Sequence, residues 1–139
     1  SPYTEEHARQ WLARLPGERA RGEHVSFAIT DARDGMLLGM VGLVSISWED
    51  ARAEVGAWMA PGSRHRGAAR RALRLLSDWA FQSLGMRRLE GLIHPSNVAS
   101  RRLVERCGLT HEGRLRSYAV MKGERVDLLL FSLLPGEFR

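Results

Sequence analysis

Cysteine and lysine are almost missing from this 139-residue sequence, which contains one of each, Cys107 and Lys122. A single cysteine excludes a framework of internal disulfides. No apolar run approaches the ~20 residues that a membrane-spanning helix needs, and no signal peptide with a basic start and an apolar centre is visible. Repeats and low-complexity segments are absent too. We therefore expect a single domain over residues 1–139 that works in the cytoplasm without a membrane partner.

Acidic residues are outnumbered by basic ones, 16 to 21, which gives a formal net charge of +5. Such a charge fits proteins that bind nucleic acids or acidic ligands. The basic residues are spread along the chain, however, and neither an aromatic stacking motif nor a recognition helix accompanies them, so nucleic acid is not the expected partner. No metal site is predicted, because four of the five histidines lack the spacing with cysteine or carboxylates that metal ligands need. These four are His7, His24, His65 and His111.

The most informative stretch is residues 61–71, PGSRHRGAARR, between a predicted strand at 53–59 and a predicted helix at 66–84. A strand, a short glycine-bearing loop and a helix start direct several backbone N–H groups at one point, where the helix dipole also favours an anion. Arginine charges at this end of a helix are unfavourable beside its positive dipole end unless a bound anion offsets them. Five of them crowd it: Arg64, Arg66, Arg70, Arg71 and Arg74. The stretch therefore predicts a phosphate site.

Hydrophobic periodicity predicts the remaining elements and the fold class. Three strands close in sequence suggest an antiparallel meander, and a strand, helix, strand succession suggests a parallel crossover. The fold class is therefore α+β (mixed α/β), with a central, mostly antiparallel twisted sheet, one parallel crossover and flanking helices. Strands are expected at 25–30, 36–48, 53–59, 87–93, 110–121 and 125–134, and helices at 1–15, 66–84 and 97–106.

Apolar residues of helix 66–84 form a broad stripe that we expect to be buried. The stripe consists of Ala69, Leu73, Leu76, Ala80 and Leu84, widened by Ala72, Leu75 and Trp79. Cys107 continues the apolar stripe of the next helix and is expected in the core rather than as a reactive thiol.

Several motifs in a fixed order resemble the Gcn5-related N-acetyltransferase (GNAT) superfamily, specifically its RimJ/RimL-like branch. The resemblance runs from about residue 27 to residue 134. Its strongest part is EVGAWM at 54–59 leading into RHRGAA at 64–69, which fits the family's Arg/Gln-x-x-Gly-x-Gly/Ala pyrophosphate loop. Further along come NVAS at 97–100, residues 103–109, EGRL at 112–115 and Asp127. The family's first strand and helix have no counterpart in this pattern, so the domain looks short at its N-terminus.

The resemblance implies direct transfer of an acetyl group from acetyl-CoA to a primary amine. The predicted acceptor is a protein or peptide N-terminal α-amine, as for ribosomal-protein-alanine acetyltransferases. A small amine such as a polyamine or an aminoglycoside, and CoA binding without catalysis, are the open alternatives; a homodimer is also open. The CoA pyrophosphate would bind the backbone amides of Arg64, His65, Arg66, Gly67, Ala68 and Ala69.

The resemblance also implies where the acetyl group is activated. The pantetheine arm of CoA would pair with residues 57–59, at the end of the strand before the loop, and a backbone N–H of Trp58 or Met59 would polarise the thioester carbonyl. Many family members place a tyrosine acid at the position that Val104 occupies here, so that acid is absent. Asn97 and Ser100 are the predicted site residues of the same helix, with Asn97 on the cofactor arm and Ser100 as the acid near the sulfur.

A base that removes the proton of the attacking amine is less clearly marked. Glu49, Glu54 and His94 are the candidates by their expected position near the cleft, and Glu54 completes the predicted catalytic set. His94 precedes a proline at a strand end, where a histidine is more often a loop residue without a catalytic role.

Overall fold

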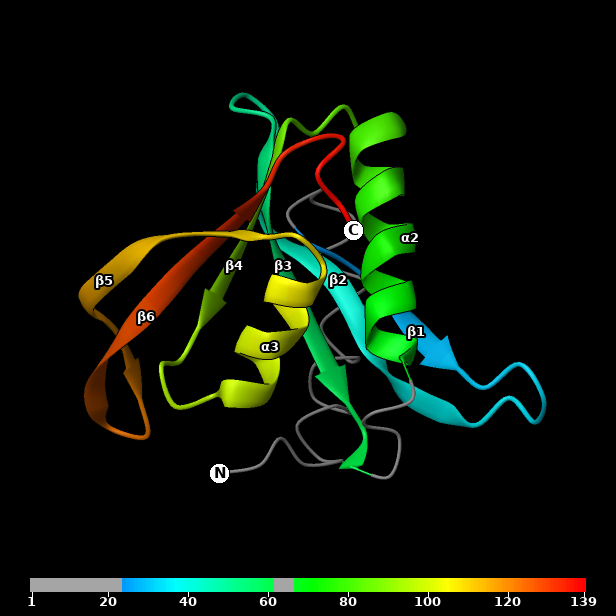
Figure 1. Ribbon diagram of the computed structural model, residues 1–139, viewed down its shortest axis with the longest axis horizontal. Coiled ribbons are helices and arrows are strands. Elements are labelled where there is room, and N and C mark those ends of the chain that lie inside the picture. The colour runs from blue at the N-terminus through cyan, green and yellow to red at the C-terminus, as the bar shows by residue number, and fades with distance from the viewer. Residues whose placement is uncertain (1–23, 62–66) are drawn as a thin grey trace.

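The computed structural model describes residues 24–61 and 67–139, which form six strands and two helices (Figure 1). In chain order these are β1 (Val25–Thr30), β2 (Leu37–Ser47), β3 (Arg52–Met59), α2 (Ala68–Gln82), β4 (Arg88–Ile93), α3 (Val98–Arg106), β5 (Thr110–Met121) and β6 (Glu124–Leu133). The strands and helices predicted within these ranges are present, with ends that differ by a few residues. The helix predicted at 1–15 lies outside the described residues.

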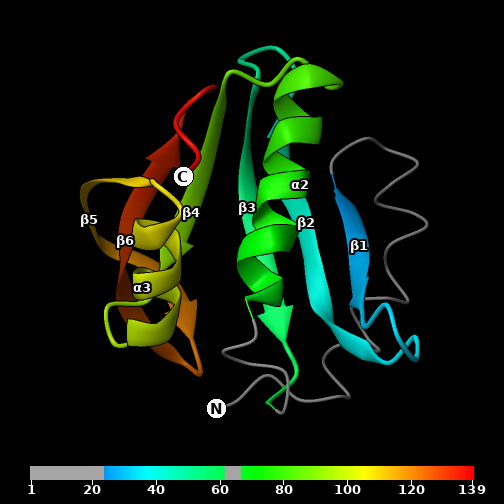
Figure 2. The ribbon, with the colours of Figure 1, turned by 45° about the vertical axis from the view of Figure 1, so that its right-hand side comes forward.

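One six-stranded sheet, in the order β1-β2-β3-β4-β6-β5, forms the centre of the fold. All neighbouring strands are antiparallel except β3 and β4, which α2 connects as a parallel crossover. Both helices lie on the same face of the sheet (Figure 2). The predicted mixed fold class is confirmed. No helix in the described part of the chain is long and apolar enough to cross a membrane.

Strands β3 and β4 separate soon after they pair, and this separation positions the site. The parallel pairing joins only Arg52–Glu54 to residues 88–90. Beyond Glu54, β3 continues beside β2 as far as Met59, which pairs with Gly39. Strand β4 continues beside β6 as far as Ile93. The inner edges of the two strands therefore run on without a partner strand.

The core lies between the sheet and α2. Leu43, Ala80 and Leu89 are fully buried there, and so is Cys107, as predicted. Burial raises the pKa of the Cys107 thiol, as expected for an unreactive core cysteine.

The buried stripe of α2 is narrower than the sequence predicts. Leu73, Leu76 and Ala80 are buried, and Ala72 and Trp79 pack partly against the core. Leu75, in contrast, is 72% exposed. It lies about 100° around the helix from Leu76, on a flank that no described element covers.

Two glycines of β2 allow its neighbours to come close. A Cβ atom on Gly39 would lie 2.2 Å from the carbonyl oxygen of Trp58, and one on Gly42 would lie 2.3 Å from the carbonyl oxygen of Val25. Any other residue at either position would force the strands apart. The glycines thus allow β2 to pack closely against β1 and β3.

Candidate active site

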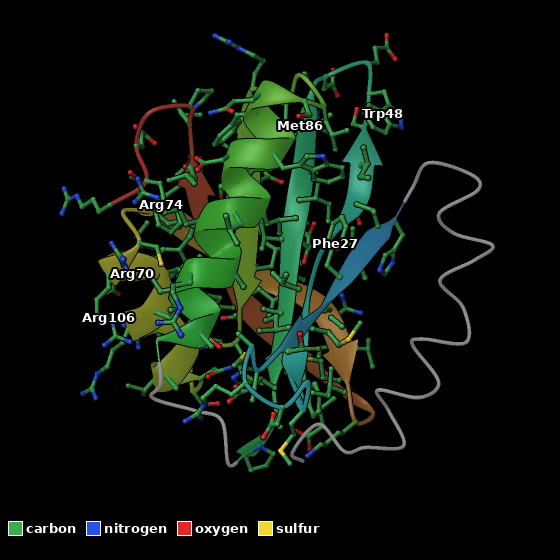
Figure 3. All side chains as sticks on the ribbon, turned by 90° about the vertical axis from the view of Figure 1, so that its right-hand side faces the viewer. Phe27, Trp48, Arg70, Arg74, Met86 and Arg106 are labelled. Atoms are coloured by element: carbon green, nitrogen blue, oxygen red, sulfur yellow. The ribbon has the colours of Figure 1, made fainter. Side chains whose placement is uncertain are left out.

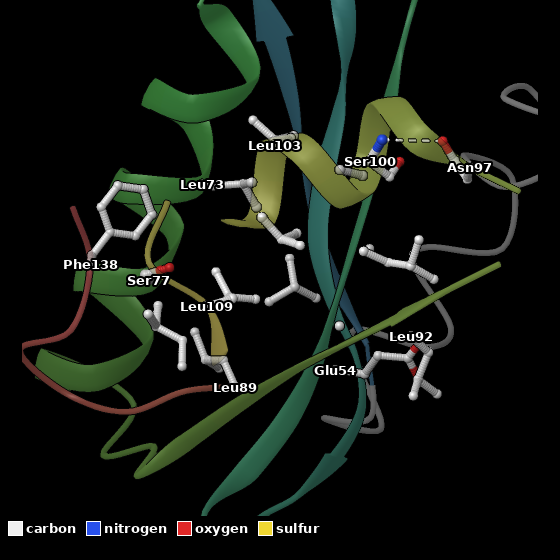
Figure 4. A pocket seen from close by; sticks show the side chains of 17 residues that line it. Glu54, Leu73, Ser77, Leu89, Leu92, Asn97, Ser100, Leu103, Leu109 and Phe138 are labelled. Atoms are coloured by element: carbon white, nitrogen blue, oxygen red, sulfur yellow. Dashed lines mark hydrogen bonds between the residues drawn. The ribbon is translucent and has the colours of Figure 1, made fainter. Parts of the chain in front are cut away.

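A cavity of about 260 Å³ occupies the split between β3 and β4, beside α3 (Figure 4). Its walls include successive residues of β3, 54–57, and of β4, 91–93. Successive residues of a strand point to opposite faces, so a wall that contains all of them includes the backbone edges themselves. The other walls come from Leu73, Ser77, Asn97, Ser100, Leu103, Val104, Leu109, Leu133 and Phe138, with Leu89 at the base.

The hydrogen-bond ladder shows which amides of β3 face this cavity. The N–H of Ala60 donates to the carbonyl of Leu38 at 2.8 Å, in register with the β2–β3 pairs. Because hydrogen-bonded and non-bonded pairs alternate in an antiparallel ladder, the N–H of Trp58 points toward β2. The N–H groups of Ala57 and Met59 point to the open edge. The prediction of a cleft-facing donor is therefore corrected for Trp58 and extended to Ala57.

The N-terminus of α2 begins at a glycine that provides no side-chain cap. Its N-cap, Gly67, has φ 72° in the left-handed region, makes no side-chain cap, and is followed by no acidic residue in the first turn. The first N–H groups of the helix, including those of Ala68 and Ala69, are therefore free of a side-chain acceptor from the cap. Arg64, His65 and Arg66 lie outside the described residues, so their part in the phosphate loop stays a prediction.

Two arginines of α2 contact the C-terminal residues. Arg70 and Arg74 lie over the ring of Phe138, 5.7 and 5.5 Å from its centre, and Arg70 also donates to the carbonyl of Arg139. Figure 3 shows both on the same flank of the molecule as Arg106. These guanidinium groups thus tie the C-terminal residues to α2, and only their long-range charge acts on the helix start.

Asn97 and Ser100 meet at the start of α3. The side-chain oxygen of Asn97 accepts from the backbone N–H of Ser100 at 3.1 Å, which makes Asn97 the N-cap of the helix (Figure 4). Ser100 and Val104 are four residues apart, lie on one face of α3, and both line the cavity. Val104 also packs against the apolar cluster of Ile93 and Phe131. On this face Ser100 places a hydroxyl one helical turn before Val104.

Of the three candidate bases, Glu54 lies at the cavity. It is half-buried, and burial raises the pKa of its carboxyl, with a smaller contribution from the charge of Glu90. His94 is held at the turn before α3, where its Nδ1 accepts from the backbone N–H of Ser96 at 3.1 Å. Glu49 is exposed in the turn between β2 and β3, away from the cavity-lining residues.

Ser77 and Phe138 line the cavity, and neither is among the site residues that the sequence predicts. Ser77 is 3% exposed and interrupts the apolar stripe of α2, so a polar residue in a buried face was an available signal. Phe138 reaches the cavity from the C-terminal segment, and no local pattern marks that contact.

Comparisons with known proteins agree with this geometry. Residues 1–110 match the family model described as an acetyltransferase (GNAT) domain. The uncharacterized N-acetyltransferase p20 of Bacillus licheniformis is 30% identical over 139 residues, 99% of this chain and 78% of that protein. The spermidine N(1)-acetyltransferase of Vibrio cholerae is 26% identical, over 81% of this chain and 64% of that enzyme.

A solved structure extends the likeness from sequence to fold. A Vibrio cholerae protein provisionally assigned as a ribosomal-protein-serine acetyltransferase superposes with a TM-score of 0.85 and 26% identity, covering 96% of this chain and 76% of that one. The family model covers most of the chain. The chain therefore belongs to the GNAT family of acetyl-CoA-dependent N-acetyltransferases.

Proposed function

We propose that this protein acetylates the α-amine of a protein or peptide N-terminus, as an enzyme of the RimJ/RimL-like branch. The observation that carries the proposal is the open edge of β3, whose cleft-facing amides lie in the wall of the cavity beside Ser100. An extended ligand that bears amides can pair with such an edge as an added strand would. The likeness to the Vibrio cholerae protein supports the choice of acceptor.

The chain offers groups for each part of acetyl-CoA. The amides of the pantetheine arm would pair with residues 55–59, and the pyrophosphate would lie at the start of α2, where the glycine cap provides no side-chain acceptor for the first N–H groups. The carboxamide of Asn97 uses its oxygen as the helix cap, so its nitrogen remains as a donor to the arm. The thioester carbonyl would accept from the N–H of Ala57 or Met59.

In the transfer step the neutral amine attacks the thioester carbonyl, so that a C–N bond forms and the C–S bond then breaks. Glu54 accepts the proton that the amine nitrogen loses. Ser100 donates its hydroxyl proton to the departing thiolate and regains one from solvent. The raised pKa of Glu54 brings its proton affinity closer to neutral pH, which suits a general base.

A small polyamine is the second candidate acceptor. Two observations favour it: the similarity to the spermidine enzyme, and the carboxylates of Glu54 and Glu90, which lie side by side in register on β3 and β4. A polyamine carries several positive charges, which such carboxylates would attract.

A thiol-release assay over N-terminal peptides, polyamines and aminoglycosides tests the proposal. Turnover that is fastest on peptides is the expected result, and turnover confined to polyamines would replace the proposed acceptor by the second candidate. Calorimetry with acetyl-CoA runs in parallel. Binding without turnover on any amine would make the protein a CoA-binding domain, and an absence of binding would contradict the placement of the cofactor.

A further inference from the structure

A cluster of charged and polar side chains lies across the sheet on the face opposite α2. Glu54 pairs in register with Glu90, and Glu90 pairs with Ser132. Residues in register point to the same face of a sheet, and the alternate positions Leu89 and Leu133 are buried under α2. Glu54, Glu90 and Ser132 therefore share the outer face.

Within this cluster, Arg88 links Glu90 to Glu112. Its Nε donates to Glu90 at 2.8 Å, while its two terminal nitrogens donate to the two carboxylate oxygens of Glu112, at 2.7 and 3.1 Å. Ser132 donates to Glu112 as well. A forked, two-bond contact is stronger and more directional than a single bond. Arg88 therefore binds Glu112 with two nitrogens and Glu90 with one N–H.

The charges around Glu54 follow from this arrangement. Glu90 is its neighbour across the strand pair, and its side chain is 26% exposed, so solvent screens its charge only in part. On the other side, β2 places the apolar Val44 in register with Glu54. The nearest cation on β3, Arg52, pairs with Asp50. Among the described residues, Glu54 thus faces a carboxylate without a guanidinium of its own.

We propose that Glu90, clamped by Arg88, is a positioning residue that keeps Glu54 basic enough to take the proton from the acceptor amine. The inference rests on the proposed function, because it assigns Glu54 the role of base. Burial is the main cause of the raised pKa of Glu54, and the charge of Glu90 adds to it in the direction that the inference requires. Glu90 then acts through its charge and its fixed position, without contact with the acetyl group.

A titration of the Glu54 carboxyl tests the inference without any assay of activity. The full chain, labelled with ¹³C at the glutamate carboxyls, is titrated by NMR, and Glu54→Gln identifies the resonance. Glu90→Gln removes the charge at nearly constant shape, so the midpoint of Glu54 is expected to move to lower pH. Arg88→Gln leaves both partner carboxylates uncompensated, so the midpoint is expected to move to higher pH.

Two further variants keep the inference open to contradiction. Glu112→Gln frees Arg88 to bind Glu90 more fully, so it is expected to lower the midpoint of Glu54, whereas Glu90→Asp, which retains the charge, is expected to leave it near that of the parent. Melting temperatures confirm that each variant is folded. An unchanged midpoint of Glu54 in folded Glu90→Gln would overturn the inference. A shift of that midpoint to lower pH in Arg88→Gln would overturn it too.

Kinetics then separate this inference from the proposed function. In Glu90→Gln the acidic limb of the kcat/KM profile is expected to follow the titration to lower pH, while the plateau falls by about twofold to tenfold because the base is weaker. A purely structural role would lower the rate at every pH alike. If the titration shifts as expected but no amine is acetylated, the coupling of Glu90 to Glu54 stands and the proposed function fails.

Discussion

The two sides of the β3–β4 split are built in different ways. On the side of α2 and α3, the site consists of backbone amides, a glycine cap and a short run of helix. On the opposite side it consists of charged side chains from β3, β4 and β5 and a serine from β6, brought together by register. Local sequence dictates the glycine cap and the helix starts of the first side, whereas the orientation of its amides and the whole of the second side depend on strand pairing. Variants that affect one side and spare the other sharpen this contrast.

The largest effect is expected from Gly67→Glu. A residue with a side chain at φ 72° is strained, and the added carboxylate would lie where a pyrophosphate is proposed. We expect binding of acetyl-CoA, measured by calorimetry, to fall by more than about 100-fold. Gly85→Glu is the matched control, because Gly85 has the same φ and open space around it. Equal loss in both variants would show that strain alone explains the result.

Ala57→Pro tests the orientation of the β3 amides. Proline removes the cleft-facing N–H and leaves the ladder to β2 intact, so kcat is expected to fall by about 100-fold or more while the fold survives. Trp58→Pro removes a bond of the ladder and is expected to unfold the sheet, as circular dichroism would show. The reverse outcome, an unfolded Ala57→Pro and a folded Trp58→Pro, would invert the assignment of the amides.

Ser100→Ala removes the hydroxyl proposed to protonate the thiolate. We expect kcat to fall by about 10- to 100-fold, at the lower end of acid catalysis because water can replace a serine in part. Binding of acetyl-CoA, measured by calorimetry, is expected to stay within about twofold of the parent, since no backbone donor is lost. An unchanged kcat would exclude Ser100 as the acid.

Asn97→Ala separates helix capping from cofactor binding. Loss of the cap is expected to cost about 1 kcal/mol of stability in denaturant unfolding. Asn97→Asp keeps an acceptor for the N–H of Ser100 but removes the side-chain donor, so stability should remain while affinity for acetyl-CoA falls. If both variants bind acetyl-CoA like the parent, Asn97 is a cap and nothing more.

The smallest effect is expected from Glu54→Gln on stability. The pKa of Glu54 is raised in the folded state, so stability falls as the pH rises through that pKa, and the ionised carboxylate costs stability above it. The variant is therefore expected to melt about 1–2 °C higher than the parent at pH 8, with a smaller difference at pH 4. Equal melting curves at both pH values would contradict a burial cost at this position.

Much of the fold follows from the sequence because its signals are local. Alternation of apolar and polar residues marks the strands, and the loop at Gly67 marks the start of the crossover that α2 makes from β3 to β4. Leu75 shows the limit of this reasoning, since the width of a buried stripe depends on what the fold places against the helix.

At the site, prediction from the sequence is limited by the pairing register of the strands. Gly67, Ala68, Asn97 and Ser100 follow from motifs, but the fork from Arg88 to Glu112 spans 24 residues of sequence and arises from strand pairing. The amides that face the cleft likewise depend on the phase of the β2–β3 ladder. No pattern of residues within one strand reports that phase.

The brevity of the β3–β4 pairing also has a consequence for folding. The meander β1–β2–β3 and the hairpin β5–β6 each join segments that are close along the chain, so both can form by closing short loops. The three-residue parallel pairing that unites the two halves must wait for α2 to bring β4 back. We therefore expect the cavity to be the last feature assembled, and its amides to exchange hydrogen with solvent sooner than those of the meander.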